Sequence, residues 1–243
     1  MPFYNYDYYN NFHYTSVEEL KAKAQEYVEK EKAAGNKLSP VFLDSKVIAK
    51  SWWGKAWCSN LELYADYTSR LERGRKYVKA NCVVDLQIET GSVRALVQGS
   101  SSKPYTVRVR IDELTDEQYK NVISKCSSKI QNLEDLISGN FPDDLKELFT
   151  QKKGGLFPSM ANIHFDCTCP DVADMCKHVA AVLYAIGSRF DTEPLLFFKL
   201  RGVDTDSLIG NAIQDRLDKM IANADVKSSR IISDNEAKAL FGV

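Results

Sequence analysis

The sequence predicts an α+β fold, in which a small antiparallel β-sheet is flanked by helices and is followed by a helical C-terminal part. Three segments at 82–89, 93–99 and 104–111 are rich in Val, Ile, Leu and Tyr, alternate in part with polar residues, and are separated by Gly and Ser. Helix start signals lie on both sides of these segments, and apolar helical patterns dominate after Cys176. These three observations define the fold class.

The composition is that of an ordinary globular protein. Of the 243 residues, 44% are hydrophobic and 27% are charged, which is enough to bury a core and excludes disorder throughout, a collagen-like repeat and a disulfide miniprotein. No apolar run approaches the roughly 18 residues of a membrane helix, and the first residues, MPFYNYDYYNNF, lack the basic start and apolar centre of a signal peptide. We expect a cytoplasmic protein with no membrane partner.

Four segments are predicted along the chain. An aromatic tail and a solvated helix occupy 1–44, where Thr15-Ser16 with Glu18 and Glu19 opens a charged helix that runs to about Ala34. A basic α+β domain at 45–155 holds the three strands, read as a three-stranded meander, then a helix at about 115–136, a short helix after Pro142 and a turn at 152–155. The remaining segments are 156–204, with extended residues at 161–165, and a region of C-terminal helices at 205–243.

The C-terminal third is predicted to be helical. Apolar patterns place helices at 179–188, 193–200, 205–223 and 234–240, and residues 226–233 read as a linker. In the basic domain, Trp53 and Trp57 lie one helical turn apart and are expected to be buried together.

Four metal-binding side chains are concentrated in one short stretch, at Cys167-x-Cys169 and, after six intervening residues, Cys176-x-His178. Two pairs of soft or borderline donors fit a tetrahedral zinc site, and three thiolates with one imidazole leave no position for a substrate or water. The sequence therefore predicts structural zinc in a turn that leads into a helix, with Asp174 as a candidate cap of that helix.

The other candidate donors are expected to be structural. Cys58, Cys82 and Cys126 lie singly among apolar residues and are predicted to be packing residues. His164 is a spare donor, expected to pack in its strand or to touch the ligands.

These residues resemble a known family. The motif is similar to a SWIM zinc finger, in which C-x-C, a short loop and C-x-H are followed by an apolar helix. The wider chain resembles the bacterial SWIM zinc finger proteins over about residues 45–205. The segments that carry this resemblance include SWWGKAWC (51–58), SRLERGRKYVKA (69–80) and LFPSMANIHFDCTCPD (156–171). The resemblance implies zinc bound by Cys167, Cys169, Cys176 and His178, binding of DNA or protein, and a Snf-type helicase-like ATPase as partner. This chain has no phosphate-binding G-x-x-x-x-G-K-[ST] loop of its own.

A near-zero net charge of −1 hides a basic segment. Residues 46–110 carry 12 Lys and Arg against five acids, a net charge of +7, whereas residues 111–150 carry a net charge of −5. Cations interleaved with aromatic rings are typical of nucleic-acid binders, although basic runs are also common on solvated surfaces. Gly74 is expected to bring backbone amides close to a phosphate. The predicted contacts for nucleic acid or a partner protein are Arg70, Arg73, Arg75, Lys76, Lys79 and Lys177.

Three functions are compatible with these features. The main hypothesis is a non-enzymatic zinc-binding module that binds nucleic acid, DNA in the first place, and the alternative is a protein-interaction subunit that docks on a helicase-like ATPase without touching nucleic acid. The third hypothesis is a nuclease in which Asp85, Asp112 and Glu113 hold a divalent ion on the sheet. No paired carboxylates and no G-x-S-x-G motif support catalysis. Separately, the alternation of the strand at 104–111 predicts that Arg108 and Arg110 share one of its faces.

Overall fold

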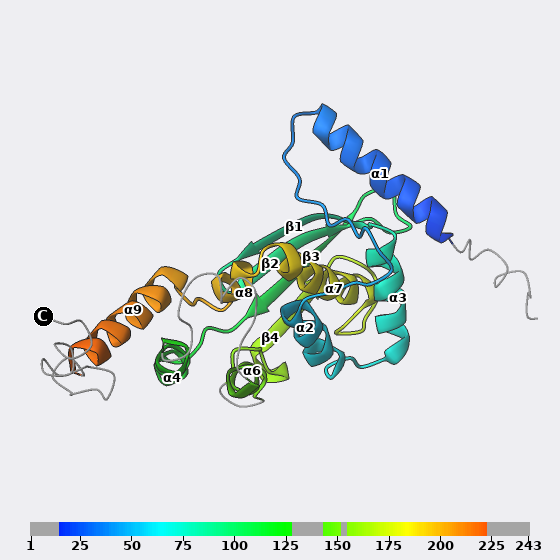
Figure 1. Cartoon of the computed structure of the whole chain (residues 1–243). Helices are drawn as coiled ribbons and strands as arrows, with labels where there is room; N and C mark the ends of the chain where they lie inside the picture. Colours follow the sequence, from blue (N-terminus) through cyan, green and yellow to red (C-terminus); the bar gives the residue numbers. More distant parts are fainter. Residues whose placement is uncertain (1–14, 128–142, 152–154, 223–243) are drawn as a thin grey trace, which may run out of the picture.

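The protein is described by a computed structural model in which residues 15–127, 143–151 and 155–222 are placed (Figure 1). The tail at 1–14, the end of the helix predicted at 115–136, most of the turn at 152–155, the linker at 226–233 and the helix at 234–240 lie outside these residues. The structure confirms the α+β class, with helices around an antiparallel sheet.

The sheet has four antiparallel strands in chain order, β1 (Val83–Glu89), β2 (Ser92–Val97), β3 (Tyr105–Ile111) and β4 (Ile163–Cys167). The prediction of a three-stranded meander is one strand short, because the extended segment after residue 161 joins the edge of β3 with Val107 opposite Cys167. Local patterning detects a hairpin partner a few residues away, but it carries no signal for a partner more than 50 residues away. This added strand brings the first metal ligand to the sheet.

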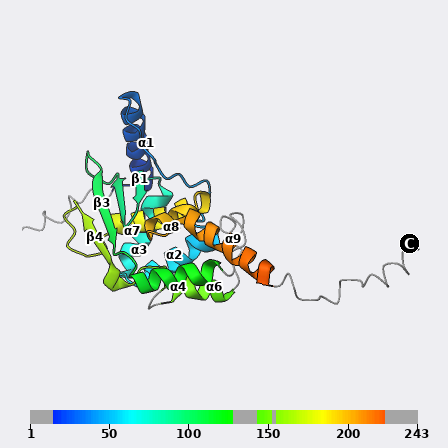
Figure 2. The same ribbon diagram turned by 90° about the vertical axis from the view of Figure 1, so that its left-hand side faces the viewer.

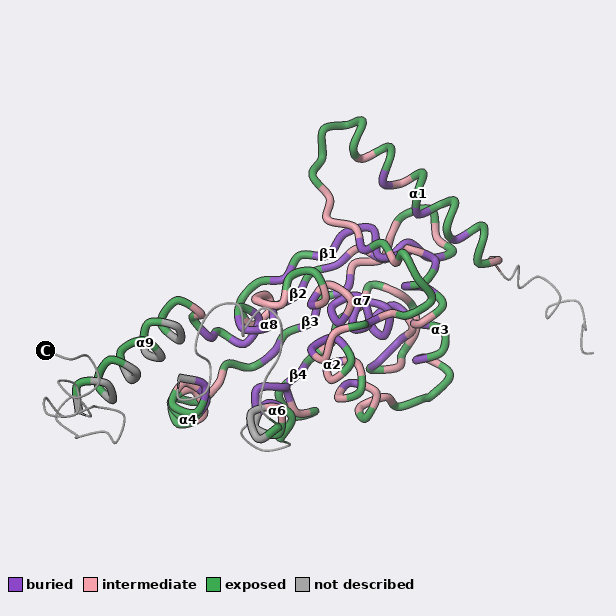
Figure 3. Tube along the Cα trace, in the orientation of Figure 1, coloured by how far each residue is buried: buried purple, intermediate pink, exposed green. Residues whose placement is uncertain are grey.

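Helix α7 (Lys177–Thr192) covers the inner face of the sheet and contacts all four strands (Figures 1 and 2). Its sequence is apolar on almost every side, and every residue from His178 to Gly187 is buried (Figure 3). Helices α2 (Trp52–Glu62) and α3 (Thr68–Lys79) pack on α7 from the side away from the sheet, and α8 (Leu195–Leu200) packs on β1.

Two glycines allow α2 and α3 to approach α7 closely. A Cβ atom on Gly54 of α2 would lie 2.4 Å from the carbonyl oxygen of Gly187, and one on Gly74 of α3 would lie 2.6 Å from the Cβ of Ala180. The indole rings of Trp53 and Trp57 fill the remaining space and are almost fully buried, which confirms the prediction for this pair. The helix layer is therefore held at distances that larger residues would not permit.

The remaining helices lie around this centre. Helix α1 (Val17–Ala33) starts with a reciprocal capping box between Ser16 and Glu19 and buries only Leu20, Ala24 and Val28, in agreement with a mostly solvated helix. Helices α4 (Asp116–Ser127), α6 (Asp143–Thr150) and α9 (Thr205–Ala222) lie beyond the sheet at the end opposite α3 (Figure 1). None of the helices in the described ranges is long and apolar enough to cross a membrane.

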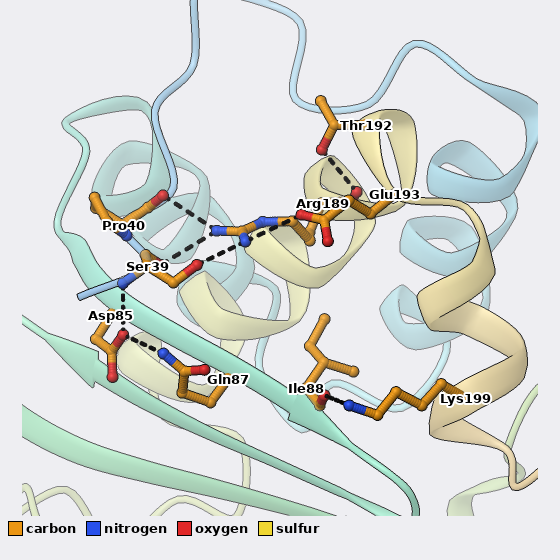
Figure 4. Close-up of polar contacts among 9 residues, drawn as sticks. All are labelled: Ser39, Pro40, Asp85, Gln87, Ile88, Arg189, Thr192, Glu193 and Lys199. Atoms are coloured by element: carbon orange, nitrogen blue, oxygen red, sulfur yellow. Dashed lines mark hydrogen bonds and ion pairs between the residues drawn. The ribbon is translucent and has the colours of Figure 1, made fainter. Parts of the chain in front are cut away.

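The outer edge of β1 is closed by residues 39–41 (Figure 4). The amide of Val41 donates to the carbonyl of Val83, and the amide of Leu86 donates to the carbonyl of Ser39. Arg189 of α7 fixes this segment by donating to the hydroxyl of Ser39 at 2.7 Å and to the carbonyl of Pro40 at 3.1 Å. One cluster of buried hydrophobic residues includes members from Leu20 to Val203, on both sides of the boundary predicted at residue 155. The division of the chain into four segments stays a prediction.

Candidate metal centre

The four predicted ligands come together at the junction between the sheet and α7. Cys167 ends β4, Cys169 lies in the turn that follows, Cys176 is the N-cap of α7, and His178 is the second residue of that helix. Their ligand atoms all lie within 4.8 Å of one another, and no other group of three or more such donors is found in the described parts of the chain. The structure thus brings together the four residues that the spacing predicts as ligands.

Cys176 both caps the helix and offers a thiolate. Its Sγ accepts a hydrogen bond from the amide of Val179 at 3.5 Å, so Cys176, and not the exposed Asp174 two residues earlier, is the N-cap, and the Asp174 prediction is wrong. The thiol of Cys167 donates to the Cys176 sulfur, and this contact, with smaller contributions from His178 and the Val179 amide, lowers the pKa of Cys176 to about 4. A helix N-terminus favours the anionic form in the same direction.

The other two thiols hold their protons more tightly in the absence of a metal. The pKa of Cys167 is raised well above its usual range, first because its thiol donates to the Cys176 sulfur and second because it is partly buried. Burial is also the main cause of the raised pKa of Cys169. A divalent cation would replace these shared protons, because it stabilises all three thiolates at once.

The imidazole of His178 is oriented by packing. Its ring stacks on Tyr105 at a centroid distance of 4.4 Å and meets the edge of Tyr77 at 5.4 Å. The ring points Nδ1 at the cysteines, at 3.9 Å from the Sγ of Cys167 and 4.0 Å from the Sγ of Cys176. Nδ1 is therefore the nitrogen placed to bind a metal. Nε2 is buried and has no hydrogen-bond partner among the described residues.

The donor set fits zinc. Tetrahedral zinc with bonds of about 2.0 Å to nitrogen and 2.3 Å to sulfur separates its ligands by about 3.5–3.8 Å, close to the nitrogen–sulfur distances seen here. Three thiolates and one imidazole complete the four-coordinate shell, which is the composition of a structural site. Bound zinc would join the end of β4 to the start of α7.

Comparison with known proteins agrees with this geometry. Residues 166–187 match the family model of the SWIM zinc finger. The chain carries a SWIM zinc finger. It is also similar to a Mycobacterium tuberculosis protein named uncharacterized protein Rv2102, with 35% identity over 179 residues, or 73% of this chain, and it spans 64% of the length of that relative. No solved structure matches the chain.

The SWIM finger is tied to α3, on which most of the predicted contact residues lie. Arg70 forms an ion pair with Asp171 at 3.1 Å, which connects α3 to the loop between the two ligand pairs. Arg75 pairs with Glu62 at 2.6 Å and lies over the ring of Tyr184. These two acidic partners lie on other elements, and no local pattern in the sequence indicated them. The remaining three predicted contacts on α3 have exposed side chains and lack ion-pair partners in the described ranges: Arg73, Lys76 and Lys79.

Gly74 does not serve the role expected from the sequence. The segment Ser69–Ala80 is helical up to Lys79 rather than a phosphate-binding loop, and Gly74 is buried against Ala180 of α7. A phosphate cannot reach its amide through that helix contact. The sixth predicted contact, Lys177, is half-buried with its Nζ 5.5 Å from the ring centroid of Tyr77, and Tyr77 in turn packs on His178.

The spare donors lie apart from the ligands. His164 is exposed on β4 and lies 3.2 Å from Asp112, so it packs in its strand rather than against the metal. Cys82 and Cys126 are fully buried and Cys58 is half-buried, and burial raises the pKa of each thiol to about 12, which makes all three poor nucleophiles.

The acids of the nuclease hypothesis do not form a cluster. Asp85 of β1 lies across from Leu96 of β2, which in turn lies across from Thr106 of β3. Asp112 follows Thr106 by six residues, which places it about 20 Å further along the strand direction at 3.4 Å per residue. Asp85 is also engaged with the amide of Ser39 at 2.8 Å. One divalent ion cannot bind both carboxylates.

Proposed function

We propose that this zinc-binding module is non-enzymatic and binds nucleic acid, DNA in the first place, in the cytoplasm. The observation that carries the proposal is the solvent side of α3, where Arg73, Lys76 and Lys79 follow one another at helical spacing without acidic partners in the described ranges. Residues three apart lie on the same helix face, so these cations form one stripe, which we call the α3 stripe. Unpaired cations in a row fit a phosphate backbone.

The zinc would support this stripe without taking part in any reaction. Its four protein ligands close the coordination shell, so a substrate has no open position. The metal fixes the N-terminus of α7, and α7 positions α3 through the Gly74–Ala180 contact and through the Arg70–Asp171 pair on the neighbouring loop. Lys177 in the first turn of α7 would extend the basic surface from α3 toward the finger.

Replacing Arg73, Lys76 and Lys79 together by Ala is expected to weaken binding to DNA of unrelated sequences to a similar extent. Each lost phosphate contact on duplex DNA lowers the slope of log affinity against log salt by about 0.9, so the slope should fall by roughly 2–3. Fluorescence anisotropy of a labelled duplex across a salt series measures it. Arg75 is left unchanged because Glu62 already neutralises it.

A matched control removes the same charge elsewhere. Lys46, Lys50 and Lys55 are exposed and lie outside α3, and their replacement by Ala changes the net charge equally. The proposal requires the control variant to keep most of the salt dependence. If both triple variants bind as the wild-type protein does, the α3 stripe does not contact DNA.

A second candidate function, docking on a helicase-like ATPase, is supported by α9. Its exposed apolar residues Ile213, Leu217 and Ile221 recur every four positions, and each residue is between 47% and 71% exposed. Such a stripe on a helix at the periphery of the fold (Figures 1 and 3) is typical of a protein-binding face.

Leu217→Lys is expected to abolish binding of a purified Snf-type helicase-like ATPase if α9 is the docking face, because it places a charge in the centre of the apolar stripe. Binding is measured by surface plasmon resonance with the immobilised chain. Gln214→Lys, which adds the same charge beside the stripe, should bind normally. Equal binding by the wild-type protein and Leu217→Lys would remove α9 from this function.

A further inference from the structure

We propose that the outer face of the β-sheet is a second anion-binding surface, which holds the phosphodiester backbone of a nucleic acid through Arg94, Arg108 and Arg110. We call these three residues the arginine patch. They lie on strands β2 and β3, opposite the face covered by α7, and their side chains are exposed. The site is separate from the α3 stripe, and it does not depend on that stripe being correct.

The register of the sheet places the three arginines together. Arg94 lies directly opposite Arg108, and Arg110 follows two residues later on the same face, opposite Ser92 and His164. Neighbouring strands are about 4.8 Å apart, and residues two apart on a strand are about 6.8 Å apart, so the patch is compact. Like charges placed directly opposite on adjacent strands destabilise a sheet. An anionic ligand would relieve this repulsion.

The acids on and around this face are mostly engaged elsewhere. Glu89 pairs with Lys199 at 2.7 Å. Asp85 accepts hydrogen bonds from the amide of Ser39 and from the side chain of Gln87 (Figure 4). Asp112 contacts His164 at 3.2 Å. Asp166 alone among the described acids reaches the patch, at 3.5 Å from Arg108, and both side chains of that pair are 63% exposed. Arg94 and Arg110 therefore remain without a counter-charge in the described ranges.

The surroundings favour a phosphate backbone over a base-reading or peptide site. The same face presents Gln87, Ser92 and Thr106 beside the arginines, and none of the described large exposed apolar residues lies on the strands. Bases would find no stacking platform there, and a peptide would find no pocket for an apolar anchor. Planar guanidinium groups bind phosphate oxygens in a two-pronged geometry.

Helix α1 limits the patch at one end. Ala24 and Val28 of α1 pack on Val84 of β1, with Leu96 of β2 alongside, and Leu96 is two residues from Arg94 on the same face. The amino group of Lys23 also donates to the carbonyl of Ser100, which fixes the helix next to the sheet. The open part of the face thus begins at Arg94 and continues toward Arg110. We expect a nucleic-acid backbone to reach this part of the face without contacting α1.

The test replaces Arg94, Arg108 and Arg110 by Gln, which leaves a polar side chain able to form hydrogen bonds while it removes the charge. Binding of a labelled oligothymidylate is measured across a salt series by anisotropy, beside the wild-type protein, the α3 triple variant and the Lys46, Lys50 and Lys55 control. For a single strand, each lost contact lowers the salt slope by about 0.7, so a drop of about 2 is expected. The arginine variant should also melt no lower than the wild-type protein without ligand, because repulsion between Arg94 and Arg108 is removed.

The outcomes separate the two surfaces. A reduced slope in the arginine variant supports the patch whether or not the α3 variant is also reduced. A reduced slope in the α3 variant alone overturns the patch and leaves the proposed function in place. Wild-type binding by both variants overturns both. Weaker binding of polyglutamate by the arginine variant, with unchanged binding of oligothymidylate, would show an acidic protein to be the ligand and would also overturn the proposal.

Discussion

Removal of zinc is expected to unfold the turn at 167–176 and the first turn of α7. Metal binding contributes on the order of 10 kcal/mol to the folding of small zinc domains, and here the four ligands join the end of β4 to the N-terminus of α7. Hydrogen exchange after chelation should show lost protection at 167–179, whereas the amides of β1–β3 should stay protected, because the apolar core holds them. Equal protection with and without zinc would contradict a structural role.

Cys176→Ser separates the two roles of that residue. Serine is a good N-cap, so the hydrogen bond from Val179 is retained, but a hydroxyl is a poor zinc ligand. We expect this variant to lose zinc, measured by elemental analysis, and to melt well below the wild-type protein. Asp174→Ala is the control, since Asp174 is exposed and caps nothing, and it should keep both zinc content and melting temperature. Full zinc retention by Cys176→Ser would remove Cys176 from the ligand set.

Gly74→Ala is expected to destabilise the protein, although alanine is the better helix former. The new Cβ would lie 2.6 Å from the Cβ of Ala180 and 3.0 Å from two backbone atoms of α7, so α3 would have to move away. Overpacking of this kind costs typically 1–3 kcal/mol, which lowers the melting temperature of a chain of this size by several degrees. Thermal unfolding followed by circular dichroism measures the change.

Two variants make this test specific. Gly210→Ala in α9 meets nothing within 4 Å, so it should stabilise its helix by up to about 1 kcal/mol. Combining Gly74→Ala with Ala180→Gly removes the shortest contact and should recover part of the loss. If Gly74→Ala is instead neutral and lowers only DNA affinity, the glycine faces a ligand and the described packing is incorrect.

Sequence patterns of short range were sufficient for the metal centre. Cys-x-Cys and Cys-x-His place each pair of donors within one turn of chain, and two such pairs seven residues apart leave little freedom in how they meet. The meander is similar, because its strands are joined by short turns that fix the neighbours. The buried helix after Cys176 is evident from its continuous apolar sequence, although it begins and ends beyond the predicted bounds.

The pairing of β4 with β3, the burial of Gly74 against Ala180 and the partners of Arg70 and Arg75 were decided only by the tertiary structure. Each depends on elements distant in sequence, whose relative placement is set by the packing of the whole core around α7. A strand's own alternation put Arg108 and Arg110 on one face, but the register against β2 brought Arg94 opposite Arg108. Local propensity fixes which residues share a face, whereas contacts between faces follow from the shape of the core that joins them.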